Sequence, residues 1–75
     1  MGLKARLQVT LQVLVLSRFE ERGIELTPSQ GLELLSMVTD YAYDFAQMHG
    51  RIPPYLVLLS SASRIFEAIE EAKDE

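Results

Sequence analysis

The side chains of this sequence that could carry out catalysis or bind a metal are one histidine, a spaced pair of aspartates and a group of serines. The single histidine, His49, directly precedes Gly50, and the chain contains no cysteine. Catalysis or zinc binding would require companion ligands at suitable spacings, and none accompanies His49. An imidazolium is favoured at the negative end of a helix dipole, so we expect His49 to close a helix rather than to form a site.

Two aspartates, Asp40 and Asp44, are four residues apart, so on a helix they would stand together and could bridge a divalent cation. Two carboxylates without further oxygen ligands make a weak site, and a solvated polar face is the better interpretation. A cluster of serines has no neighbouring base to activate it; its members are Ser60, Ser61 and Ser63. We therefore predict no catalytic residue, no metal site and no cofactor, and a protein that is not an enzyme.

The glycines are isolated and form no phosphate-binding loop; they are Gly2, Gly23, Gly31 and Gly50. A terminus, a turn or a helix end explains three of them. Gly31 instead falls inside the first turn of an expected helix, at a cost of about 1 kcal/mol relative to alanine. We interpret it as a candidate point of close approach by another backbone.

Size and composition indicate one domain, residues 1–75, that needs extra stabilisation. A chain of 75 residues buries proportionally little surface and is marginal alone. Without cysteine and with one histidine, disulfides and a structural metal are poor candidates, which leaves oligomerisation. The net charge of −4 has the wrong sign for gripping phosphates, so direct nucleic-acid binding is an unfavoured interpretation.

Two breaks divide the chain into three segments. Thr27-Pro28-Ser29-Gln30 has the composition of a capping box with proline at the first helical position, and Gly50 followed by Pro53-Pro54 is typical of a helix end and a new start. These signals predict helices over about 3–22, 28–49 and 54–73. The expected fold class is all-α, a small three-helix bundle that we expect dimerisation to complete.

The second and third segments each place apolar residues on one face at about 100° per residue. For residues 28–49 this face comprises Leu34, Leu35, Met37, Val38, Tyr41, Ala42, Phe45 and Met48. For residues 54–73 it comprises Tyr55, Leu58, Leu59, Ala62, Ile65, Phe66 and Ile69. Both patterns predict helices that bury one side.

The first segment is ambiguous because apolar residues alternate from residue 7 to residue 15, which is typical of a strand. We favour a helix, since a lone strand has no partner in the chain to satisfy its backbone groups. A strand over residues 7–16 stays open as the alternative.

As a helix, this segment is apolar around most of its circumference. A first row, Leu3, Leu7, Leu11 and Leu14, could be covered by the other two helices, whereas a second row, Ala5, Val9, Val13 and Leu16, lies largely on the opposite side. We predict that the second row, together with the exposed aromatic residue Tyr43, forms a partner interface. The alternative is that Ile24, Leu26 and Ile52 from the connections cover this side.

Charge placement suggests what the partner is. Lys4 and Arg6 lie near the start of the first helix, and acidic residues crowd the end of the third: Glu67, Glu70, Glu71, Asp74 and Glu75. Both sets oppose the dipole of their own helix. An antiparallel second copy could bring opposite charges together, so we predict a two-fold homodimer in which the first helix meets its symmetry mate or the third helix of the other copy.

The sequence thus favours a small, acidic, non-enzymatic protein that acts through protein-protein interaction, as a homodimer and with a larger protein as a further partner. A helix-turn-helix regulator of transcription is the alternative, because a short turn joins the second and third segments. No small-molecule substrate is evident. The apolar run of residues 7–16 is too short to span a membrane. A basic start before such a run has the outline of a signal peptide, but polar residues interrupt the run and no small-residue cleavage site follows, so we expect a cytoplasmic location.

Overall fold

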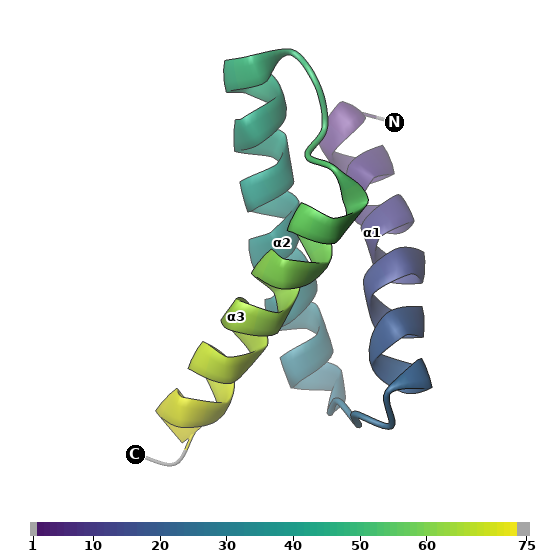
Figure 1. Ribbon diagram of the computed structural model, residues 1–75, viewed down its shortest axis with the longest axis vertical. Coiled ribbons are helices and arrows are strands. Elements are labelled where there is room, and N and C mark those ends of the chain that lie inside the picture. The colour runs from purple at the N-terminus through teal and green to yellow at the C-terminus, as the bar shows by residue number, and fades with distance from the viewer. Residues whose placement is uncertain (1, 74–75) are drawn as a thin grey trace.

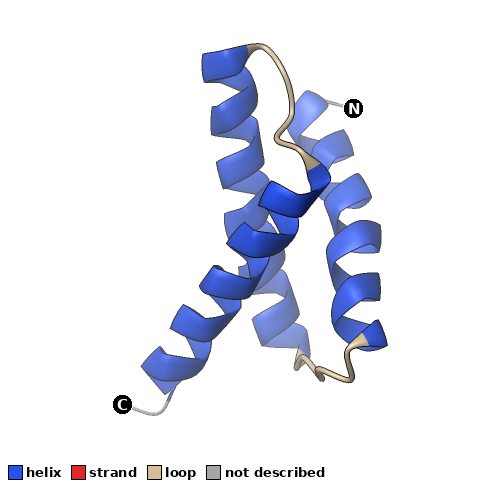
Figure 2. Ribbon diagram, in the orientation of Figure 1, coloured by secondary structure: helices blue, strands red, loops and turns tan. Residues whose placement is uncertain are grey.

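Three α-helices form the fold of the computed structural model, which describes residues 2–73, and no strand occurs in that range (Figure 2). Helix α1 spans Leu3–Glu21, α2 spans Pro28–His49 and α3 spans Tyr55–Lys73. The all-α prediction is confirmed, and the expected bounds differ from the observed ones by no more than one residue. Within the described range, none of the helices combines the length and apolarity needed to cross a membrane.

Local hydrogen bonds explain why the helices stop and start where they do. After the end of α1, Gly23 adopts the left-handed conformation, with φ of 74°. The N–H of the next residue, Ile24, donates to the Phe19 carbonyl at 3.0 Å, which closes the helix. The predicted capping box is present, because the Gln30 N–H donates to Thr27 Oγ1 at 3.2 Å and the Thr27 N–H donates to Gln30 Oε1 at 3.1 Å. These caps use hydrogen bonds between residues at most five positions apart, and they locate both ends of the first connection.

Residues 7–16 lie within α1, so the strand alternative is wrong for this segment. Every fourth residue of a helix returns to nearly the same side, and the buried residues of α1 follow that spacing. We call them the inner stripe: Leu7, Leu11, Val15 and Phe19. The helix therefore satisfies its own backbone and buries one side, which a lone strand could not do.

The inner stripe packs into one core with residues of the other two helices. The core members outside α1 are Leu34, Leu35, Val38, Ala42, Leu58 and Ala62. Helices α1 and α2 run antiparallel, and α3 crosses α2 diagonally (Figure 1). The Phe19 and Phe66 rings join α1 to α3 edge to face, with centroids 5.4 Å apart.

The crossing of α3 leaves part of the first row uncovered, contrary to expectation. Leu7 and Leu11 are buried, but Leu3 is 57% exposed and Leu14 is also exposed. The third helix meets α1 through Phe66 near the C-terminal end of α1, so it gives no cover to Leu3. Two of the four residues of the first row are therefore buried, and two are exposed.

The expected face of α2 is also buried only in part. Leu34, Leu35, Val38 and Ala42 belong to the core, whereas Met37, Tyr41 and Met48 are exposed. In Figure 1 the C-terminal end of α2 extends beyond the start of α3. An amphipathic pattern marks a face that can be buried, and the crossing decides how much of it is.

Gly31 has no close neighbour, so no other backbone of the chain explains it. A Cβ atom built at this position would meet nothing within 4 Å, and its φ is not positive, unlike that of Gly50 at 71°. The interpretation of Gly31 as a point of close approach is wrong within the single chain. Its cost to the helix is then not offset by packing.

We expect Gly31→Ala to raise the free energy of unfolding by about 0.5–1 kcal/mol, because alanine loses less backbone entropy in a helix. Urea denaturation should show a higher midpoint with an unchanged slope. The matched control is Gly50→Ala, which should lower stability by about 1–2 kcal/mol because Gly50 is left-handed. A Gly31→Ala variant that is less stable than the wild type would contradict the open surroundings of Gly31.

Candidate partner interface

The second row of α1 lies on the outside of the molecule. Val9 is 55% exposed and Val13 is 62% exposed, and Ala5 is exposed as well. At about 100° per residue, Val9 and Val13 point nearly opposite to the middle of the inner stripe. The core packing that buries one side of α1 therefore turns these two valines toward solvent.

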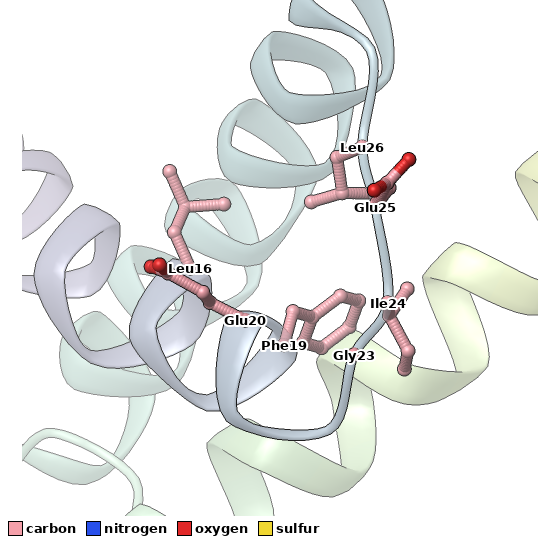
Figure 3. Close-up of a pocket in the computed structure, with 7 residues that line it drawn as sticks. All are labelled: Leu16, Phe19, Glu20, Gly23, Ile24, Glu25 and Leu26. Carbon is pink, nitrogen blue, oxygen red and sulfur yellow. The ribbon is translucent and has the colours of Figure 1, made fainter.

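Leu16, the last member of the second row, is half-buried and borders two surface hollows. One lies at the C-terminal end of α1, where Leu16 and Glu20 project from the helix and Leu26 lies across from them on the connection (Figure 3). The other lies between α1 and the start of α2 and includes Leu26, Leu32 and Leu35. The apolar surface of the second row thus continues past Leu16 onto exposed Leu32 of α2.

The residues proposed as an alternative cover do not cover the second row. Ile24 and Leu26 are half-buried and pack against the core, and Ile52 is exposed. Val9 and Val13 keep their exposure with the whole described chain in place. The connections therefore close the ends of the core and leave the outer side of α1 open.

Tyr43 occupies a different environment from the one expected. Its side chain is half-buried and packs against the core, and the Lys4 ammonium lies 5.6 Å from the centroid of its ring. Lys4 shares the side of α1 that carries Leu7 and Leu11, so Tyr43 lies between α1 and α2. The premise that Tyr43 is a freely exposed aromatic is wrong, and the tyrosine is not brought together with the second row.

An ion pair joins the start of α1 to α2. The Lys4 ammonium lies 2.7 Å from the Asp40 carboxylate. This hydrogen bond, with the attraction of the same carboxylate, raises the pKa of Lys4 above its ordinary value of 10.5. Asp40 therefore serves an ion pair that ties the start of α1 to α2.

The residues considered for chemistry do not converge. His49 ends α2, is exposed, and its ring centroid lies 4.3 Å from that of Phe45. Within residues 2–73 the structure brings together no group of three or more His, Asp, Glu or Cys side chains that could hold a metal ion. Asp44 is exposed on the surface of α2.

A second exposed apolar surface lies around the connection between α2 and α3, and the sequence analysis missed it. We call it the 48–57 surface; it comprises Met48, Ile52, Tyr55, Leu56 and Val57, of which Met48 is 79% exposed and Leu56 76% exposed. A signal was available, because Leu56 and Val57 fall outside the apolar stripe of α3. Exposed apolar residues therefore occur on the outer side of α1, on α2 and around the connection between α2 and α3.

Comparison of the chain with protein-family models, with curated proteins and with solved structures finds no match. The functional argument consequently depends on the surface and the charges of this chain.

We expect the ε-methylene NMR signals of Lys4 to titrate above pH 10.5 in the wild type and closer to 10.5 in Asp40→Asn. A folded-state pKa above the unfolded value stabilises the fold below pH 10.5, and this contribution is lost as the pH rises through the folded-state pKa. Asp44→Asn is the matched control and should move the titration less, because Asp44 acts on Lys4 only through longer-range attraction. Equal titration in all three proteins would exclude the ion pair in solution.

Proposed function

We propose that this protein is a small non-enzymatic interaction protein that acts as a homodimer, and that the second row of α1 is its dimer interface. The observation that carries the proposal is the exposure of Val9 and Val13, at 55% and 62%, in the middle of a helix whose other side is buried. Isolated exposed apolar residues are ordinary, but a row along one helix face is typical of an interaction surface.

Energetic need supports the same conclusion. Among the described residues, ten apolar ones make up the buried core, which is a small core for a chain that must offset the conformational entropy of folding. Full burial of a valine side chain contributes about 1.5–3 kcal/mol relative to exposure, and a dimer would add part of that for each copy of Val9 and Val13. Association through this row would stabilise the fold as well as create the assembly.

Direct DNA binding is the weaker hypothesis. In a helix-turn-helix reading, α3 would be the helix that reads base edges, and its first turn exposes Leu56 and Val57. Base edges are read by side chains such as arginine, lysine, asparagine and glutamine, and the chain as a whole carries a net charge of −4. The exposed chemistry of this region favours protein over nucleic acid.

The 48–57 surface supports a second part of the proposal, in which the dimer regulates a larger protein. This surface lies on α2, α3 and their connection, and its member Leu56 lines a hollow with Arg18, which at about 100° per residue points away from the second row of α1. A dimer formed through α1 would therefore present two copies of it to other proteins. The cytoplasm remains the expected compartment, on the sequence argument alone.

We expect the wild type to sediment as a dimer at tens of micromolar, and Val13→Glu to raise the dissociation constant at least tenfold by placing a charge in the interface. Met48→Glu is the matched control, because it changes a similarly exposed apolar residue on α2 and should leave the dimer intact. Circular dichroism should show equal helix content in all three. A well-folded wild-type monomer at these concentrations would contradict the proposed dimer.

For the regulatory part, we expect tagged wild-type protein and Val13→Glu to capture the same larger protein, and Leu56→Glu to lose it, because Leu56 belongs to the 48–57 surface. Quantitative mass spectrometry of the captured proteins measures the difference. Capture that is equal for Leu56→Glu and the wild type would remove the 48–57 surface as the contact, while leaving the dimer unaffected.

A further inference from the structure

The outer side of α1 carries a regular spacing of residues that extends beyond the second row. Arg6, Val9, Val13, Leu16 and Glu20 follow one another at intervals of 3, 4, 3 and 4 residues. This is the spacing of a seam along which two helices pack in a coiled coil. Arg6 and Glu20 are exposed at its two ends, with the apolar residues between them.

Four of the five residues of this seam are exposed, and only Leu16 is half-buried. Glu20 projects from α1 together with Leu16 (Figure 3), and α1 forms one edge of the molecule with α2 and α3 to the same side of it (Figure 1). A helix laid along α1 from Arg6 to Glu20 would contact Val9 and Val13 directly, and beside Leu16 it would also meet Leu26 of the connection and Leu32 of α2. The seam is also nearly symmetric, since Arg6 and Glu20 are each seven residues from Val13.

We propose that the occupant of this seam is the same seam of a second copy, packed antiparallel about a two-fold axis close to Val13. This inference rests on the proposed dimer and adds its orientation and register. Seven residues of helix span about 10.5 Å, so in this arrangement Arg6 of each copy lies opposite Glu20 of the other. A parallel pair would instead place like charges against each other at both ends.

The charges at the ends of the seam are available for this pairing. The ion pairs among the described residues join Lys4 to Asp40 and Arg18 to Glu21, and neither involves Arg6 or Glu20. By contrast, Lys4 is engaged within its own chain. Opposite charges that are equidistant from the centre of an apolar row and free of internal partners are what a self-complementary two-fold interface requires.

The acidic end of α3 is a less suitable counterpart for α1 of another copy. Glu70 accepts a hydrogen bond from Gln30 Nε2 at 2.6 Å, which ties the end of α3 to α2. The sequence suggested that the basic start of α1 pairs with the acidic end of α3 in another copy. Lys4 is already bound to Asp40, and Glu70 is already bound to Gln30, so each of these two sets has one charged group fewer for such a contact. The test must therefore distinguish packing of α1 on α1 from packing of α1 on α3 of the other copy.

Charge reversal tests the register. Arg6→Glu and Glu20→Arg should each raise the dimer dissociation constant about tenfold at low salt, because each reversal places like charges together at two symmetry-related positions. The double variant, Arg6→Glu with Glu20→Arg, should return to within about threefold of the wild type. The matched control is Glu33→Arg, an exposed acidic residue of α2 that lines neither hollow beside Leu16, which should change the constant less than about twofold.

The outcomes distinguish the inference from the proposed dimer. A wild-type dimer that ignores both single reversals, or a double variant weaker than either single one, would overturn the antiparallel seam and leave a dimer of another geometry. Weakening by Glu71→Lys, with no effect of Glu20→Arg, would assign the contact to α3. A wild-type monomer would overturn both proposals.

Cysteine cross-linking tests the antiparallel orientation independently. It is suited to this chain because the sequence contains no cysteine. Under mild oxidation, an equimolar mixture of Arg6→Cys and Glu20→Cys chains should form the mixed disulfide dimer at least fivefold faster than either chain links to itself. A parallel pair would reverse this preference. Circular dichroism of the reduced variants should show the helix content of the wild type, because both positions are exposed.

Discussion

The packing of the inner stripe of α1 against α2 is the constraint on which the rest of the structure depends. Leu7, Leu11, Val15 and Phe19 are spaced four residues apart, and this spacing turns one side of the helix into the core. Once that side is chosen, the orientation of every other residue of α1 follows. The exposure of Val9 and Val13 is thus a direct consequence of what the core requires.

Because α3 crosses α2 diagonally, it leaves the outer side of α1 and the 48–57 surface uncovered. The Phe19 and Phe66 rings hold α1 and α3 together at one place, and the ends of the helices extend away from it. Three short helices joined in this way bury a single core and leave the outer side of α1 and the 48–57 surface apolar. A larger chain would cover such surfaces with further elements, and here the proposed partners take that role.

Polar contacts fix the helix ends, and they do not involve the charged side chain of Arg6. Lys4 joins α1 to α2 through Asp40, and Gln30 serves both its capping box and the Glu70 carboxylate. These contacts satisfy polar groups near the core and restrict how the helices can slide. Arg6 lies two residues from Lys4 on the other side of α1, outside these contacts, which is why it can contribute to recognition by a second copy.

Local signals in the sequence were sufficient for the elements: Pro28, the capping box beside it and Gly50 determine helix ends through interactions within a few residues. They also indicated that α1 has more apolar surface than one side can bury. They could not select that side, because Leu14 and Val15 are equally apolar and only the packing against α2 makes Val15 internal. Likewise, the place of Tyr43 beneath Lys4 depends on two helices meeting at one register, which is a long-range property. The sequence by itself therefore determined the helices and their apolar content, and the tertiary structure decided which apolar residues face water, because burial depends on the neighbours that the crossing angles provide.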